Sequence, residues 1–118
     1  MREVFGGVRI VTFVTKNLAR ARTFYVDQLG FSVVKEEPAH FVMVNVGTFR
    51  LCIDRADDAH PAKGGGSTLI FRVKNLAKTA KELDVRGVGY ESFTGARVGD
   101  YLETSDPDGY RIVFTERL

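Results

Sequence analysis

The sequence has few of the features that mark secreted, disulfide-bonded or membrane proteins. Its 118 residues include one cysteine, Cys52, so no disulfide can form within the chain, and a reducing compartment fits this usage. The first apolar run is interrupted by Arg9 and Lys16, and it reads neither as a signal peptide nor as a membrane span. We therefore expect a cytoplasmic protein that does not act at a membrane.

Neither sign of charge dominates the chain. Seventeen basic residues are interspersed among 15 acidic ones, for a formal net charge of +2, so nothing here demands a nucleic-acid partner. The content of 44% hydrophobic and 27% charged residues is that of an ordinary globular protein. A chain of this length can bury about two thirds of its unfolded surface, which predicts one domain over residues 1–118.

The chain contains the same pattern of predicted elements twice. Apolar and β-branched periodicity predicts strands at 8–14, 31–36, 40–46 and 49–54 with a helix at 18–29, and again strands at 67–73, 88–93, 101–104 and 110–115 with a helix from 76 to about 87. Residues 13–19 and 71–77 agree at five of seven positions. An internal duplication follows, with modules at about 8–54 and 67–117.

Residues 55–66 join the two modules and have the composition of a linker. They include Pro61 and the run Gly64-Gly65-Gly66. The glycine run lacks the following Lys-Ser/Thr of a phosphate-binding loop and precedes a strand, so it does not predict phosphate binding. Each module is marginal as an independent core, and we expect the two to complete one structure side by side.

Side-chain alternation predicts which residues face away from the helices. If each helix covers one face of its sheet, the opposite faces carry alternate residues of the first and last strands of each module. Two such faces would together form a cup, which is the predicted site. The fold class is therefore α+β, with two βαβββ modules forming a cupped mixed sheet.

Two motifs resemble a known family. The helix that begins Asn-Leu-Ala-Arg at residue 17 and closes Gln-Leu-Gly-Phe at residue 31, and the turn Asp-Pro-Asp-Gly-Tyr at 106–110, are similar to the vicinal oxygen chelate superfamily. That superfamily includes glyoxalase I, extradiol dioxygenases, fosfomycin-resistance enzymes and bleomycin-resistance proteins. The resemblance covers residues 8–117 and implies the glyoxalase/bleomycin resistance/dioxygenase fold and a homodimer, without choosing a function.

The resemblance also implies where metal ligands would lie. Metal-dependent members place a ligand midway along each module's first strand and another in each last strand, which here are Ile10 and Thr68, then Cys52 and Val113. Isoleucine and valine donate nothing to a metal, and Cys52 alone cannot hold one. We therefore predict no metal ligand and no cofactor, and a divalent metal is disfavoured.

The remaining polar residues suggest a binding site more than a catalytic one. Glu103 and His40 are candidates for a base, but no acid–base pair is evident, and His60 is expected in a solvated loop. Arg72 replaces the Val14 of the first module and is expected either to line the cup or to pair with Glu103 or Asp54. The predicted ligand-binding residues are Ile10, Phe41, Met43, Cys52, Thr68, Ile70, Arg72, Tyr101, Glu103, Arg111 and Val113.

Three functions remain open from the sequence. The leading hypothesis is a protein of the bleomycin-resistance kind that binds a small apolar or aromatic molecule in the cup without a metal. The alternatives are a metal-dependent lyase or dioxygenase whose ligands the sequence does not reveal, and a non-catalytic dimeric partner module whose cup is filled by side chains. Whether the chain is an enzyme is left open.

Overall fold

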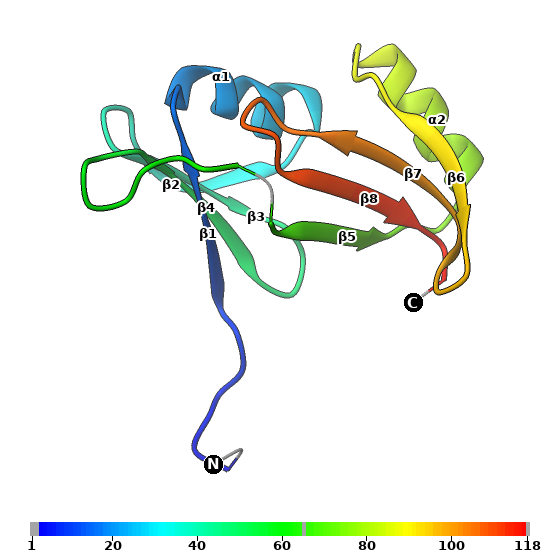
Figure 1. Ribbon diagram of the computed structural model, residues 1–118, viewed down its shortest axis with the longest axis horizontal. Helices are drawn as coiled ribbons and strands as arrows, with labels where there is room; N and C mark the ends of the chain where they lie inside the picture. Colours follow the sequence, from blue (N-terminus) through cyan, green and yellow to red (C-terminus); the bar gives the residue numbers. More distant parts are fainter. Residues whose placement is uncertain (1–2, 65, 118) are drawn as a thin grey trace. The chain divides into compact units, whose positions relative to one another are not determined.

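The computed structural model describes residues 3–64 and 66–117, and the chain divides into two compact units, 1–62 and 63–118. Gly65, in the predicted linker, lies outside the described residues, as do both ends of the predicted domain, Met1, Arg2 and Leu118. Each unit has the order strand, helix, three strands (Figure 1). The predicted α+β class and the repeated βαβββ order are thus confirmed.

The first unit is a four-stranded mixed sheet with one helical segment. Its elements are β1 (Ile10–Thr15), α1 (Leu18–Arg22) continuing as η1 (Thr23–Gln28), β2 (Ser32–Glu37), β3 (Phe41–Asn45) and β4 (Arg50–Arg55). The strand order is β1-β4-β3-β2, with β1 parallel to β4 and the other pairs antiparallel. The helix α1 packs on β3 and β4.

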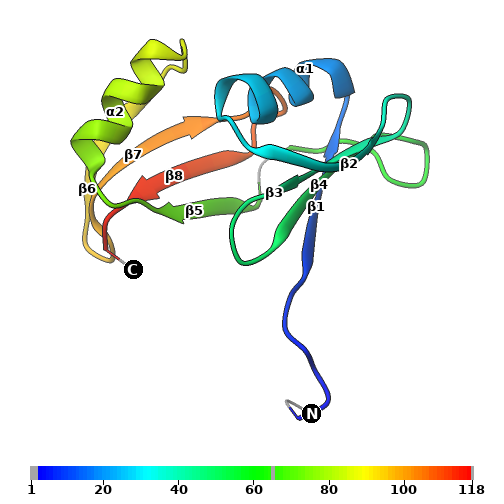
Figure 2. The ribbon, with the colours of Figure 1, turned by 180° about the vertical axis from the view of Figure 1, so that it is seen from behind.

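The second unit repeats this topology (Figure 2). Its elements are β5 (Thr68–Arg72), α2 (Leu76–Val85), β6 (Glu91–Gly95), β7 (Gly99–Ser105) and β8 (Arg111–Thr115). The strand order is β5-β8-β7-β6, β5 is parallel to β8, and α2 packs on β7 and β8. The same strand order in both units is what an internal duplication predicts.

Matching residues begin and end the two helical segments. Asn17 and Asn75 each cap a helix, because their Oδ1 atoms accept hydrogen bonds from the backbone N–H of Arg20 at 3.0 Å and of Lys78 at 2.9 Å. At the other end, Gly30 and Gly87 have φ of 79° and 71°, the left-handed conformation that glycine adopts without strain. The helix boundaries therefore follow from local sequence.

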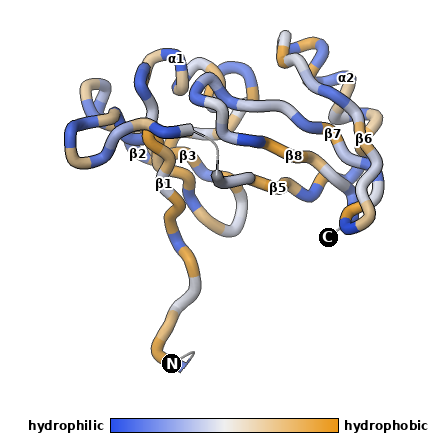
Figure 3. The backbone as a smooth tube through the Cα atoms, in the orientation of Figure 1, coloured by the Kyte–Doolittle hydropathy of each residue, from blue (hydrophilic) through white to orange (hydrophobic). Residues whose placement is uncertain are grey.

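The core of each unit lies between its helix and its sheet. Leu51 and Ile53 of β4 and Ile112 of β8 are almost fully buried, as alternation predicts for the helix-covered faces. Tyr25 is buried in the first unit, and Phe71 stacks on Phe114 in the second with ring centroids 5.8 Å apart. Figure 3 shows that the middle of β8 is continuously hydrophobic, in line with the apolar run at 112–114.

The structure shortens the gap between the strands predicted at 88–93 and 101–104. Thr94 and Gly95 belong to β6 and Gly99 and Asp100 to β7, so the connection consists of residues 96–98. The two glycines pair directly across the hairpin, and Thr115 Oγ1 lies 3.1 Å from the carbonyl oxygens of Val98 and Asp100. This anchorage of the turn to β8 is a tertiary contact that turn composition does not reveal. No helix in the described part of the chain is long and apolar enough to cross a membrane.

Candidate functional site

The face of the second sheet opposite α2, here called the free face, brings together most of the predicted site residues of that unit. The register places Ile70 opposite Val113 and Val113 opposite Glu103, and it places Tyr101 opposite Thr115. Side chains opposite one another on paired strands share a face of the sheet. The predicted cup-lining alternation in this unit therefore agrees with the strand register.

A cavity of about 300 Å³, here called the free-face hollow, lies over these strands. Its lining consists of Ile70, Gly95, Ala96, Arg97, Val98, Tyr101, Arg111 and Val113. Four of these residues were predicted as ligand-binding. The volume is at the lower end of the range for small-molecule sites, and its mixture of apolar walls with a few polar groups is typical of them.

The Tyr101 ring lines the free-face hollow and is backed by a second aromatic ring, that of Phe93, which lines a neighbouring cavity. The rings of Tyr101 and Phe93 are stacked with their centroids 5.4 Å apart and an interplanar angle of 28°. Gly95 makes room for this arrangement, because a Cβ at that position would lie 3.1 Å from Tyr101 Cε1. The Tyr101 ring is therefore held between an aromatic neighbour and a backbone that tolerates no side chain without adjustment.

The guanidinium group of Arg111 lies beside the Tyr101 ring. Arg111 Nε donates a 2.6 Å hydrogen bond to Glu103 Oε1, and Arg111 Cζ lies 6.0 Å from the centroid of the Tyr101 ring. The ion pair limits the movement of Arg111 over the ring. Glu103, a candidate base in the sequence, is thus engaged in orienting an arginine.

The structure contradicts the salt bridge predicted between Arg72 and Glu103. Glu103 is paired with Arg111, and Arg72 is exposed at the end of β5, opposite Thr115. The sheet register places Arg111 diagonal to Glu103, nearer than Arg72. The alternative pair with Asp54 would join the two units and stays a prediction.

Three residues of this region escaped the sequence analysis: Phe93, Gly95 and Arg97. Phe93 ends the strand predicted at 88–93, and Gly95 and Arg97 lie between the predicted strands. A β-hairpin over this segment would have predicted their position. Two strands joined by a short turn at 96–98 place Phe93 opposite Tyr101. Arg97 belongs to the turn that Thr115 holds against β8.

In the first unit the predicted residues are distributed over several places. Met43 and Cys52 are opposite one another, and Ile10 is half exposed opposite Arg50. Phe41 lines a separate cavity of about 190 Å³ beside α1. In the second unit, Thr68 is exposed opposite Arg111.

Neither histidine is placed with catalytic partners in its own unit. His40 is exposed in the β2–β3 connection, where its backbone N–H donates to the Glu37 carbonyl at 2.8 Å. His60 is also exposed, and its Nδ1 lies 3.3 Å from Asp57 Oδ1. The solvated loop expected for His60 agrees with this placement.

The Cys52 thiol is buried and protonated. The residue is 8% exposed, and its Sγ donates to Asp54 Oδ1 at 3.1 Å. Burial, the hydrogen bond to Asp54 and the negative charge of Asp54 raise the pKa of Cys52 to about 12. Because the thiolate is the nucleophile and the metal ligand, Cys52 at neutral pH is suited to neither role.

The residues at the implied metal-ligand positions do not fit a divalent metal. Ile10 and Val113 have no donor atom, Thr68 is a poor ligand, and the thiol of Cys52 retains its proton. Within either unit, residues 3–64 and 66–117 bring together no group of three histidine, cysteine, aspartate or glutamate side chains that could hold a metal. We therefore derive no chemical step through a metal ion.

Cys52 is expected to react slowly with alkylating reagents in the native protein. Raising its pKa from 9 to about 12 lowers the thiolate fraction near pH 8 by roughly a thousandfold, because the fraction falls tenfold per unit. The measurement is the rate of carbamidomethylation by iodoacetamide, followed by mass spectrometry. Asp54→Asn should accelerate the reaction, whereas Asp57→Asn, in an exposed loop, should not. Labelling of native Cys52 at the rate of a free thiol would contradict this.

Three other cavities border the second sheet. One of about 620 Å³ is lined by Gly89, Tyr90, Glu91, Glu103, Thr104, Ser105, Gly109 and Arg111. Another of about 410 Å³ lies between α2 and the β6–β7 edge, lined by Leu76, Ala77, Ala80, Ser92, Phe93, Thr94, Asp100, Tyr101 and Leu102. The third, of about 460 Å³, is lined by Leu76, Thr94, Gly99, Asp100, Glu116 and Arg117. Of these four cavities, the free-face hollow is the one that combines apolar walls with two arginines.

The duplicated βαβββ unit, with its mixed sheet and one covering helix, defines the class of fold. Residues 7–114 match the sequence model of the Glyoxalase/Bleomycin resistance protein/Dioxygenase superfamily. The chain therefore belongs to this superfamily. A search of curated proteins found no match.

Solved structures of the same fold come from proteins with different descriptions. TnmS3, an antibiotic binding protein from Streptomyces sp. CB03234, is 21% identical with a TM-score of 0.79 and 98% of each chain covered. A glyoxalase family protein from Bacillus anthracis is 19% identical with a TM-score of 0.81 and 100% of each chain covered. Lactoylglutathione lyase from Agrobacterium tumefaciens is 15% identical with a TM-score of 0.75, covering 95% of this chain and 94% of the other. These identities show a shared fold alone.

Proposed function

We propose that this chain binds a small planar aromatic molecule in the free-face hollow, without a metal. The observation that carries the proposal is the Tyr101 ring, stacked on Phe93 and flanked by the Arg111 guanidinium. A flat ligand can pack against this aromatic and cationic surface at little cost in conformational entropy, because the side chains are already held in place. The description of TnmS3 as an antibiotic binding protein supports the same class of function.

The alternative functions find less support in the second unit. A metal-dependent lyase or dioxygenase would need ligands that neither unit assembles among its described residues. A partner module with its free face filled by side chains would leave no room for a ligand, whereas a cavity of about 300 Å³ is present. Binding without bond chemistry is therefore the function that this site supports best.

The proposal predicts thermal stabilisation by aromatic ligands in the absence of metal. After dialysis against EDTA, the protein is screened against planar aromatic compounds by differential scanning fluorimetry, and hits are measured by isothermal titration calorimetry. We expect a subset to raise the melting temperature in a concentration-dependent manner, because a ligand that binds only the folded state stabilises it. The bound compound should be recovered chemically unchanged. Failure of every compound to bind, or turnover that requires a divalent ion, would contradict the proposal.

We also propose that the chain forms a homodimer, as its superfamily resemblance implies. The segment that precedes β1 extends away from the first sheet and carries three exposed apolar side chains (Figures 1 and 3). Val4, Phe5 and Val8 are 68%, 69% and 71% exposed. Exposed apolar groups concentrated in one segment are typical of a contact with another protein surface. A cytoplasmic location remains a prediction, compatible with the free thiol of Cys52.

The double variant Phe5→Ser/Val8→Ser is expected to raise the dissociation constant of the dimer at least tenfold. Removing two apolar side chains from an interface costs roughly 2 kcal/mol or more, which corresponds to more than a tenfold change in the dissociation constant. The measurement is multi-angle light scattering over a dilution series. Val85→Ser removes an exposed apolar side chain from α2 and serves as the control. A monomeric wild-type protein, or an unaffected double variant, would contradict the proposal.

A further inference from the structure

We infer that the molecule bound in the free-face hollow is an aromatic carboxylate whose acid group is held by Arg97 and Arg111. This inference rests on the proposed function and adds the charge of the ligand to it. Its basis is the number of guanidinium groups in the lining and the number of carboxylates available to neutralise them.

Arg111 has donors left over after its ion pair. Its Nε is engaged by Glu103 at 2.6 Å, and neither of its Nη groups makes a hydrogen bond within the described residues. A guanidinium group presents five N–H donors in a planar fork, so four of them remain for a ligand or for water. Glu103 thus orients Arg111 while leaving the outer edge of the fork available.

Arg97 is the second cation of the lining, and it forms no ion pair with any described residue. Arg97 belongs to the 96–98 turn. The hydroxyl of Thr115 donates a hydrogen bond to the carbonyl oxygen of Val98 in this turn, which anchors the backbone beside Arg97, whereas the Arg97 side chain is exposed. With Arg97 and Arg111 positive and Glu103 negative, the hollow has one positive charge in excess. An anionic ligand would neutralise it.

The remaining lining restricts the shape of that anion. Ile70, Val98 and Val113 supply apolar surface, and Val98 and Val113 are themselves buried. Apolar walls lower the local dielectric constant and strengthen the attraction between a carboxylate and a guanidinium. The carboxylate of an aromatic ligand lies at the edge of the ligand's ring. An arginine guanidinium is planar and binds a carboxylate edge to edge, with both groups in one plane.

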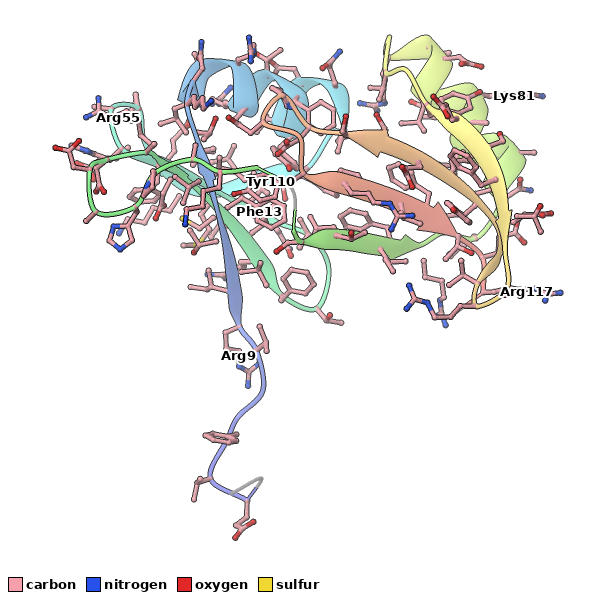
Figure 4. The ribbon with its side chains drawn as sticks, viewed as in Figure 1. Arg9, Phe13, Arg55, Lys81, Tyr110 and Arg117 are labelled. Atoms are coloured by element: carbon pink, nitrogen blue, oxygen red, sulfur yellow. The ribbon has the colours of Figure 1, made fainter. Side chains whose placement is uncertain are left out.

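The test compares two isosteric probes, 2-naphthoate and 2-naphthamide, which differ mainly in charge. Their affinities are measured by isothermal titration calorimetry on the wild-type protein, on Arg97→Gln, on Arg97→Lys and on the control Lys81→Gln. Lys81 points away from the second sheet on α2 (Figure 4). The wild type is expected to bind naphthoate about tenfold more tightly than naphthamide, since hydrogen bonds to charged groups are the stronger ones.

In Arg97→Gln this preference should fall to about twofold, chiefly through weaker binding of naphthoate, and Lys81→Gln should retain the wild-type preference. Arg97→Lys should give an intermediate value, because lysine retains the charge without the planar fork. Equal binding of both probes by the wild type, or a preference unaffected by Arg97→Gln, would overturn this inference and leave the proposed function standing. Absence of binding by both probes would overturn this inference, and the proposed function would fall with it only if the wider screen of planar aromatic compounds also found no ligand.

Discussion

Replacement of Tyr101 by alanine is expected to weaken the binding of planar aromatic ligands by roughly thirtyfold. The substitution removes the stacking surface and the partner of the Arg111 guanidinium, which lies 6.0 Å from its ring centroid. An aromatic contact contributes about 1 kcal/mol beyond buried area, and burial of roughly 40 Å² of apolar ligand surface on the ring adds about 1 kcal/mol, which together correspond to about thirtyfold. The measurement is the dissociation constant by isothermal titration calorimetry.

Three variants separate loss of the ring from loss of the fold. Tyr101→Phe retains the ring and should bind within about threefold of wild type. Tyr90→Phe removes a hydroxyl that bonds Asp84 outside the free-face hollow and should leave binding unchanged. Gly95→Ala should weaken binding because its Cβ, 3.1 Å from Tyr101 Cε1, displaces the ring. Wild-type affinity in folded Tyr101→Ala would refute the proposed location of the site.

Replacement of Asp106 by alanine is expected to lower the free energy of unfolding by about 3 kcal/mol. Asp106 is buried at the turn before β8, and its Oδ1 accepts hydrogen bonds from the backbone N–H of Asp108 and of Tyr110, both at 2.9 Å. Alanine leaves both donors without this partner, and an unpaired buried donor costs about 1–3 kcal/mol. Urea denaturation followed by circular dichroism measures the change.

Asp57→Ala provides the matched control for this turn. Its Oδ1 accepts the backbone N–H of His60 at 2.6 Å in a comparable local arrangement, but the residue is exposed and water can replace the carboxylate. We expect a loss below about 0.5 kcal/mol. Asp106→Asn, which keeps one acceptor oxygen, should be milder than alanine. Equal stability of Asp106→Ala and wild type would show that the side chain does not hold the turn.

The repeated architecture could be predicted from the sequence because its signals are local. The caps at Asn17 and Asn75, the left-handed glycines at 30 and 87 and the alternation of the strands each depend on residues a few positions apart. The assignment of Ile70, Tyr101, Arg111 and Val113 to one face of the second sheet follows from the same alternation, and all four line the free-face hollow.

The pairing of charges could not be predicted in this way. The sequence predicts that Arg72 lines the cup or pairs with Glu103 or Asp54. The β7–β8 register instead places Arg111 opposite Ser105, diagonal to Glu103, and Glu103 pairs with Arg111. Cross-strand neighbours are separated by several residues in sequence, and a shift of one position would change every partner. Register is set by the whole sheet and by its turns.

By itself, the sequence determined the duplication, the βαβββ order, the ends of the helices and the faces of the strands. The tertiary structure alone decided that Phe93 stacks on Tyr101, that the 96–98 turn brings Arg97 into the wall of the hollow, and that the Cys52 thiol meets Asp54. The physical reason is range: backbone conformation responds to neighbouring residues, whereas these contacts depend on which strands pair, and in which register.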